Sequence, residues 1–145
     1  MSPTSLGPVP PSDDVTLLCS KMKQEVVDEV MIGPQPGAFR IDNDGLSVTW
    51  VQYFKPPPPS LEQAAQAIKS DLVPKKSSVL ACAKVERILA IAQKLGIAAS
   101  VEHDPQPGNH GHSLIKGWPD EIGAKLALTR AFTSFARAID IPNFI

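Results

Sequence analysis

The sequence predicts a single α+β domain, with one antiparallel or mixed sheet of about four strands covered by about three helices. The chain has 145 residues, of which 43% are hydrophobic, and this is enough to bury a core in one domain. Residues 46–54 are rich in β-branched and aromatic side chains that mostly alternate with polar ones, which is typical of a strand. The segment after Ser60 instead repeats apolar residues at helical spacing.

Residues 1–12 are expected to form a flexible, proline-rich tail in front of a domain that spans 13–145. The segment has little apolar content and carries Pro3, Pro8, Pro10 and Pro11. Because proline fixes φ and removes a backbone donor, such a segment favours an extended, polyproline-like chain. The tail is then either inert or a recognition arm for a partner.

Residues 13–32 predict a short helix followed by an extended stretch. Val15, Leu18 and Met22 would share one helical face, whereas the later residues are rich in valine. Residues 33–37 predict a loop, because glycine and proline there interrupt regular structure.

Three helices are expected in the rest of the chain. The first begins at Ser60 and ends before Pro74, and the second spans 84–95. The third begins at Pro119 and ends before Pro142. Its buried stripe is expected to comprise Leu128, Phe132, Phe135 and Ile139. The further strands are expected at 78–83, 97–102 and 110–116, and the last two are expected to pair as a hairpin.

The charge of the chain does not favour a nucleic-acid partner, because the net charge is −1 and no basic run exceeds Lys75-Lys76. No apolar run approaches the roughly 20 residues that span a bilayer, and the N-terminus does not resemble a secretory signal. The two cysteines, Cys19 and Cys82, lack a metal-binding spacing, and Cys82 is expected to be a buried free thiol. We therefore expect a cytoplasmic protein without membrane contact.

All three histidines lie close together, at His103, His110 and His112, with Asp104 and Asn109 among them. On a strand, His110 and His112 project from one face, so they and His103 are the candidate ligands of a zinc ion. Without a metal, Asp104, Asn109 and His112 are the candidate catalytic residues, since a carboxylate beside a histidine supports acid–base chemistry. The third reading is structural: the same side chains hydrogen-bond the loop and fix its shape, and no cofactor is then needed.

Trp118 and Arg40 are the candidate binding residues outside this cluster. Trp118 stands where the last helix begins, beside the proposed site, and a half-exposed aromatic ring there can anchor a partner. Arg40 follows Phe39 in a loop, where its guanidinium either binds an anion or is simply solvated. Trp50, by contrast, is expected in the core.

The histidine region resembles a group of small uncharacterised bacterial proteins that share an H-D-P-x-P-x-N-x-x-H-like motif. The pattern in this chain reads His103-Asp104-Pro105-x-Pro107-x-Asn109-x-x-His112-x-Leu114-Ile115-x-Gly117. Three shorter matches accompany it, namely Asp14-Val15-x-Leu17, Ala38-Phe39-Arg40 and Leu46-Ser47-Val48. The resemblance implies no reaction, but it implies that Asp104, Asn109 and His112 form the core of any site.

Two functions stay open. The favoured one is a small accessory module that binds another protein, of the kind found in bacterial defence or toxin–antitoxin systems. The alternative is a small hydrolase or transferase that uses His112 and Asp104 on the 102–113 hairpin, with or without a metal. No nucleophile is marked, because Ser113 lies outside a G-x-S-x-G elbow and Cys82 has no base partner in the sequence.

Overall fold

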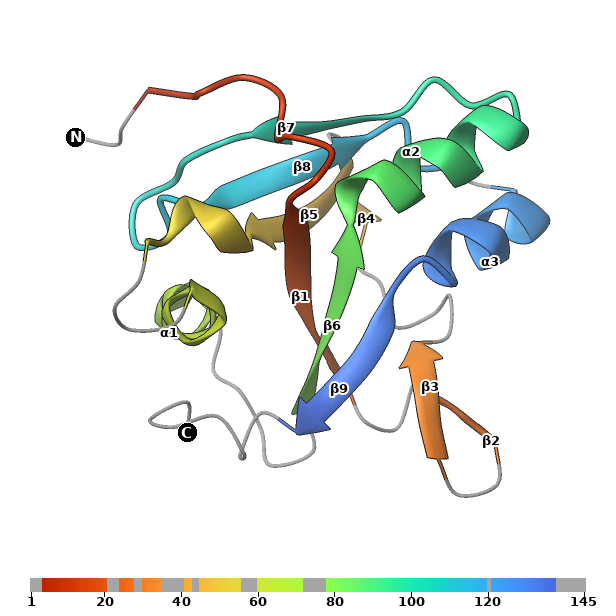
Figure 1. Ribbon diagram of the computed structural model, residues 1–145, viewed down its shortest axis with the longest axis horizontal. Coiled ribbons are helices and arrows are strands. Elements are labelled where there is room, and N and C mark those ends of the chain that lie inside the picture. The colour runs from red at the N-terminus through yellow and green to blue at the C-terminus, as the bar shows by residue number, and fades with distance from the viewer. Residues whose placement is uncertain are drawn as a thin grey trace.

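An antiparallel sheet organises the fold (Figure 1). The computed structural model describes residues 4–20, 24–27, 30–34, 41–42, 45–55, 60–71, 78–119 and 121–137. The strands of the sheet are β1 (Asp14–Ser20), β4 (Ile41–Asp42), β5 (Gly45–Trp50), β6 (Ser78–Lys84), β7 (Ser100–His103), β8 (His112–Lys116) and β9 (Thr133–Arg137). In this part of the chain their order is β7-β8-β5-β1-β6-β9, and β4 also pairs with β5.

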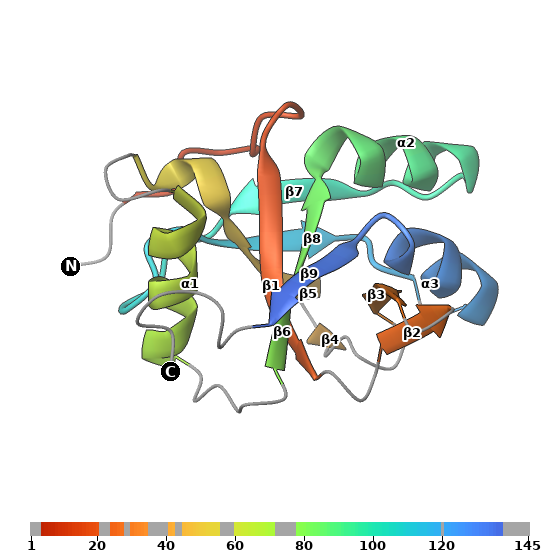
Figure 2. The ribbon, with the colours of Figure 1, turned by 60° about the horizontal axis from the view of Figure 1, so that its bottom comes forward.

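Helices flank this sheet (Figures 1 and 2). They are α1 (Ser60–Asp71), α2 (Val85–Lys94) and α3 (Ile122–Thr129), and a short 3-10 helix, η3 (Val51–Tyr53), follows β5. A separate antiparallel pair comprises β2 (Gln24–Val27) and β3 (Val30–Pro34). The predicted α+β class is confirmed, and the described sheet has seven strands, which is more than expected.

The main core lies between one face of the sheet and helices α2 and α3. Val15 and Leu17 of β1 are buried on this face, opposite the small side chains of Ala83 and Ala81 on β6. From the helices, the buried residues Val85, Ile88, Ala92, Leu128 and Phe132 join the same cluster. The alternation of side chains along β1 thus places its apolar residues against both helices.

A row of side chains with polar or thiol groups crosses the opposite face. Register places Cys82 of β6 beside Thr16 of β1, Thr16 beside Thr49 of β5, and Thr49 beside His112 of β8. Thr16 and Thr49 are buried, and the Thr16 hydroxyl donates to Ala81 O at 2.9 Å. The row therefore connects the centre of the sheet to the hairpin that carries the histidines.

Residues 14–20 form a strand, so the helix predicted for the start of 13–32 is wrong. β1 lies between β5 and β6 and pairs with β6 along its whole length. Val15 and Leu17 alternate with polar neighbours, which is the period of a strand, although Val15 and Leu18 are also at helical spacing. Pairing on both sides decides between the two periods, because it satisfies the backbone groups of the whole segment.

The last predicted helix ends much earlier than Pro142. α3 stops at Thr129, and Phe132 N donates to Thr129 O at 3.0 Å in the turn that follows. Residues 133–137 then pair with β6 as β9. The predicted stripe is thereby divided: Phe132 is buried in the core, Phe135 belongs to a strand, and Ile139 lies outside the described residues. The unpaired side of β6 decides this, since it offers hydrogen bonds that a longer helix would leave unused.

The strand predicted over 46–54 ends at Trp50, where η3 begins. Trp50 is buried in the core as predicted, and its Nε1 donates to Asp13 Oδ2 at 2.9 Å. Gln52 binds Asp14 twice, because its Oε1 accepts from Asp14 N at 2.7 Å and its Nε2 donates to Asp14 Oδ2 at 2.8 Å. These bonds join the end of β5 to the start of β1.

Residues 4–12 lie along β7, whereas a flexible tail was expected over 1–12; residues 1–3 lie outside the described residues. Val9 N donates to Val101 O and His103 N donates to Gly7 O, both at 2.9 Å, and Val9 is only 2% exposed. β7 is the edge of the sheet, so its outer backbone groups need partners, and this segment supplies them. Pro11 O and Asp13 O further along accept the first N–H groups of α2, which has no side-chain cap.

Other predictions are confirmed where the structure describes them. The extended stretch after residue 22 contains β2 and β3, α1 begins at Ser60, and the predicted strand over 78–83 is β6. The loop predicted over 33–37 is wrong at its start, because Gly33 and Pro34 belong to β3 and pair with β2; residues 35–37 and Arg40 lie outside the described residues. In the part of the chain that is described, no helix is long and apolar enough to cross a membrane.

Candidate functional site

The predicted hairpin is confirmed, since β7 and β8 pair antiparallel from Ser100↔Lys116 to His103↔Ser113. A loop of residues 104–111 joins the two strands (Figure 1). Asp104 N donates to His112 O at 2.8 Å and closes the base of this loop. Within it, Gln106 and Asn109 exchange two backbone hydrogen bonds of 3.1 and 3.0 Å, with Gly108 at a φ of 84° in the turn. The loop is therefore folded on itself.

Asn109 fixes the loop to the sheet. It is 3% exposed, and its Nδ2 donates to Thr49 Oγ1 on β5 at 2.9 Å. Its Oδ1 accepts from Gly111 N at 3.2 Å. Gly111 must be a glycine here, because a Cβ would lie 2.6 Å from the ring of Phe54. Gly111 O in turn accepts from Trp50 N at 2.8 Å, so the hydrogen bonding between β5 and β8 continues into the loop.

His103 joins the N-terminal segment to the loop. Its ring is buried, with Nδ1 accepting from Leu6 N at 2.9 Å and Nε2 2.7 Å from His110 O. A backbone N–H donates and a carbonyl accepts, so Nε2 carries the proton and Nδ1 uses its lone pair. The ring also packs against Trp50 and Tyr53, at centroid distances of 5.3 and 5.0 Å. His103 is therefore a structural residue.

The predicted zinc site of His103, His110 and His112 is not assembled. Both ring nitrogens of His103 are already bonded to backbone groups, so this ring has no lone pair for a metal. Among the described residues, no group of three or more histidine, cysteine, aspartate or glutamate side chains is arranged to hold a metal ion. The zinc prediction required His110 and His112 to lie on one strand, whereas β8 begins at His112 and His110 lies in an exposed turn.

His112 and Asp104 form a close pair, as the sequence predicted. His112 Nδ1 lies 3.2 Å from Asp104 Oδ2 and 3.0 Å from Asp104 O. Both partners are acceptors, so Nδ1 is the protonated nitrogen, and in the neutral ring Nε2 keeps its lone pair. The His112 side chain is 11% exposed and that of Asp104 is 44% exposed. Asn109 O accepts from His112 N at 3.2 Å, so the three candidate catalytic residues are neighbours.

Trp118 lies at the other end of β8, and not beside the loop as expected. Residues 104–111 precede β8, whereas Trp118 follows it. The side chain is half-buried against the core, with its ring centroid 6.4 Å from that of Phe132. A binding role for Trp118 stays a prediction, separate from the hairpin. The binding role of Arg40 is also a prediction, because this residue lies outside the described part of the chain.

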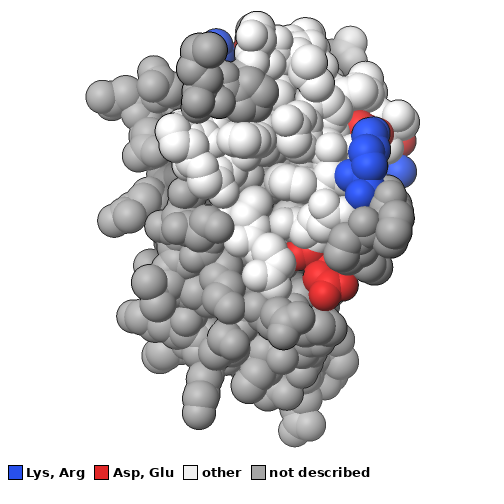
Figure 3. Space-filling model, turned by 90° about the vertical axis from the view of Figure 1, so that its left-hand side faces the viewer, with Lys and Arg blue, Asp and Glu red and all other residues white. Residues whose placement is uncertain are grey.

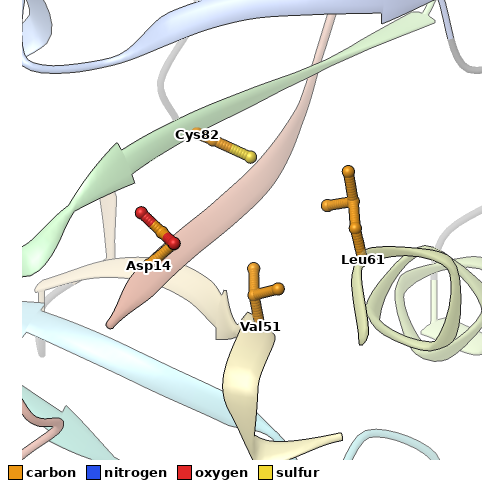
Figure 4. A pocket seen from close by; sticks show the side chains of 4 residues that line it. All are labelled: Asp14, Val51, Leu61 and Cys82. Atoms are coloured by element: carbon orange, nitrogen blue, oxygen red, sulfur yellow. The ribbon is translucent and has the colours of Figure 1, made fainter. Parts of the chain in front are cut away.

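A cleft that the sequence did not predict lies between α1 and the sheet. Its volume is about 360 Å³, and Asp14, Val51, Leu61 and Cys82 line it (Figure 4). The pKa of the Cys82 thiol is raised to about 11, chiefly because the thiol is withdrawn from water; a hydrogen bond with Thr16 lowers it, and the nearby negative charge of Asp14 raises it. Cys82 is thus a neutral thiol, and the expected free cysteine is confirmed, although the residue is half-buried and not fully buried as expected. In the sequence, Asp14 stood out only as part of the Asp14-Val15-x-Leu17 match, and this match did not indicate a cleft.

No family model, curated protein or solved structure matches this chain. The resemblance to small bacterial proteins through the H-D-P-x-P-x-N-x-x-H-like motif therefore stays a prediction. Function has to be inferred from the hairpin and from the surface around it.

Proposed function

We propose that this domain is a protein-interaction module that presents the 104–111 loop as a recognition element of fixed shape. One observation carries the proposal: the polar side chains of the motif are used to hold the loop. His103, Asn109 and His112 all bond to groups of the loop or of its immediate neighbours. A loop that is already ordered loses little conformational entropy when it binds a partner, and this favours recognition.

The surface near the loop supports a protein partner. Gln106, Pro107 and His110 are exposed at the tip, and Leu6, whose backbone is bonded to His103, is 65% exposed. Figure 3 views the side of the molecule on which the loop and the N-terminal segment lie in Figure 1. Over the described residues this face is mostly uncharged, with charged side chains gathered toward one edge. Such a face suits a protein better than a phosphate backbone.

We place this module in the bacterial cytoplasm, as an accessory protein of a defence or toxin–antitoxin type system. The support is the motif that begins at His103 and its resemblance to small bacterial proteins. An accessory role also fits a domain whose most distinctive segment is a loop and not an enclosed catalytic site.

Site-specific photocrosslinking tests the interaction. Benzoylphenylalanine replaces Pro107 at the loop tip in one variant and the exposed Ala90 of α2 in the control variant. In lysate of the organism that encodes the chain, we expect a discrete adduct from position 107 and none from position 90. The adduct should weaken when Asn109→Ala is added, because the loop then loses its side-chain hydrogen bond to Thr49 of β5. Equal labelling from both positions, or none from position 107, would contradict the proposal.

The second candidate function is acid–base catalysis by His112. It is favoured by one specific observation, namely the placement of two Asp104 oxygens at Nδ1 of His112. This arrangement holds the ring in the tautomer whose Nε2 can accept a proton from a substrate or from water. A carboxylate that orients a histidine in this way is a common part of hydrolytic sites.

Hydrolysis of p-nitrophenyl acetate across pH 5–9 tests the second candidate. If His112 is a general base, His112→Ala removes the activity and Asp104→Asn lowers it, whereas His110→Ala, which changes an exposed histidine of the same loop, has no effect. Activity that is equal in the His112→Ala and His110→Ala variants would reject catalysis by His112 and leave the interaction module.

A further inference from the structure

The cleft beside α1 has the size and composition of a ligand site. Its volume of about 360 Å³ lies within the range of roughly 300–1,000 Å³ that small-molecule pockets occupy. Four elements meet around it, since β1, η3, α1 and β6 contribute Asp14, Val51, Leu61 and Cys82 respectively (Figure 4). In Figure 4 the side chains of Cys82, Leu61 and Val51 surround a common space, and Asp14 lies at its side. The other described side chains of the lining are the apolar Val51 and Leu61 and the thiol of Cys82.

Among the side chains that the structure describes, none forms an ion pair with Asp14 at the cleft, although Lys84 of β6 stands opposite Asp14 in the register of the two strands. The ion pairs formed by these side chains are His112–Asp104 and Lys116–Glu102, and both belong to the hairpin. Val51 and Leu61 are apolar, and Cys82 is a neutral thiol because burial raises its pKa to about 11. Asp14 therefore gives the cleft its only charge among the four lining residues.

Asp14 is held in place by its neighbours. Gln52 accepts from its backbone N–H at 2.7 Å and donates to its Oδ2 at 2.8 Å, so the carboxylate is fixed on η3. Within the described residues no hydrogen bond reaches Oδ1, which leaves acceptor capacity on a positioned carboxylate. A charged group that is prepositioned in this way can recognise an opposite charge without first being ordered.

We propose that this cleft binds a small apolar amine, whose ammonium group pairs with Asp14 and whose hydrocarbon body packs against Val51 and Leu61. A carboxylate in an apolar cleft is stabilised by a cation that also donates a hydrogen bond. A divalent metal ion fits poorly, because one carboxylate and a protonated thiol supply too few ligands. The proposal goes beyond the interaction function, since no residue of the 104–111 loop is among the four that line the cleft.

The proposal also gives a role to the Asp14-Val15-x-Leu17 match, which the hairpin does not explain. Val15 and Leu17 face the main core, and Asp14 lies on the opposite face of β1, at the cleft. One short strand thus supplies both core residues and the charge of the cleft. Thr16 lies beside Cys82 on the same face and donates to Ala81 O at 2.9 Å, which links the cleft wall to the centre of the sheet.

Calorimetric titration of the full chain at pH 7.5 tests the site. The probes are benzylamine and cyclohexylamine, which are cations at this pH, and benzyl alcohol, which matches benzylamine in shape but is neutral. We expect saturable binding of at least one amine and binding of benzyl alcohol that is about tenfold weaker or undetectable, since the charge-assisted hydrogen bond is lost. Asp14→Asn should weaken the amine by a similar factor, whereas Glu86→Gln, at an exposed acid on α2, should not change it.

Asp14→Asn also alters the bond between Asp14 and Gln52, so a second variant is needed to separate loss of the ligand site from a change in the fold. Leu61→Trp fills the cleft from α1 without altering the contact between Asp14 and Gln52, and circular dichroism checks that both variants fold. Loss of amine binding in folded Leu61→Trp supports the proposal. Three results overturn it: no saturable binding of either amine, equal binding of benzyl alcohol and benzylamine, or undiminished amine binding in folded Asp14→Asn or Leu61→Trp. None of these results bears on the loop, so the interaction function is tested separately.

Discussion

At the scale of single residues, side chains of types that often act in catalysis form structural hydrogen bonds in this protein. Asn109 uses both ends of its amide to bind buried groups, and His103 uses both ring nitrogens to join the N-terminal segment to the loop. Of the Asn109, His103 and His112 side chains, that of His112 keeps a ring nitrogen that no described partner uses. Residue type and spacing predicted that these side chains lie together. They did not predict which side chains have all their hydrogen-bonding atoms paired.

Asn109→Ala tests the structural role of the amide. The change leaves Thr49 Oγ1 and Gly111 N without their partner in a buried place, so we expect the free energy of unfolding to fall by about 1–3 kcal/mol. Urea denaturation followed by circular dichroism measures this. Gln106→Ala is the matched control in the same loop, because its exposed side chain bonds only to Asp104, and it should change stability by less than about 0.5 kcal/mol. Equal effects of the two changes would contradict this role.

Cys82 gives a pH-dependent signature at the same scale. Its pKa is raised from 9.0 to about 11 in the folded chain, so the unfolded thiol loses its proton at a lower pH than the folded one. The contribution of Cys82 to stability is therefore complete below about pH 9 and declines as pH rises toward 11. We expect the stability difference between the native chain and Cys82→Ala to shrink over this range in urea titrations. A difference that is constant from pH 8 to 11 would show that the thiol is not buried as described.

At the scale of elements, pairing partners decide what local sequence leaves open. The strongest patterns, the helical stripe after Ser60 and the alternation after Gly45, predicted α1 and β5 correctly. Residues 14–20 and 133–137 carry patterns that also fit helices, and both became strands because β6 pairs with each of them. Such long-range pairing is not visible in a window of a dozen residues. The same holds for 4–12, whose order depends on the edge of β7.

The N-terminal segment is expected to contribute to stability like any other element of the sheet. Val9→Ala removes two methyl groups from a side chain that is 2% exposed, and we expect a loss of about 1–3 kcal/mol in the free energy of unfolding. Leu6→Ala, three residues away at a side chain that is 65% exposed, should cost less than about 0.5 kcal/mol. Thermal denaturation of the two variants compares them. A Val9→Ala variant as stable as the native chain would mean that the segment does not pack on β7 in solution.

At the scale of the whole molecule, the two candidate sites are joined by one face of the sheet. The row Cys82, Thr16, Thr49 and His112 runs from the cleft beside α1 to the hairpin. The sequence predicted the hairpin site, because its residues are close along the chain. It did not predict the cleft, because Asp14, Val51, Leu61 and Cys82 meet only after β1 and β6 have paired and α1 has packed. Sites that depend on tertiary pairing are in general harder to find from sequence than sites within one hairpin.

The most direct test of the interaction function is the affinity of the photocrosslinked partner, purified and titrated by calorimetry against three forms of the full chain. The double variant Gln106→Ala, His110→Ala removes exposed side chains of the tip, and Glu86→Gln is the control on α2. The account predicts that the tip variant binds about tenfold more weakly with unchanged stability, because interface energy concentrates in few side chains, and that the control binds like the native chain. A tip variant that binds as tightly as the native chain would contradict recognition by the 104–111 loop.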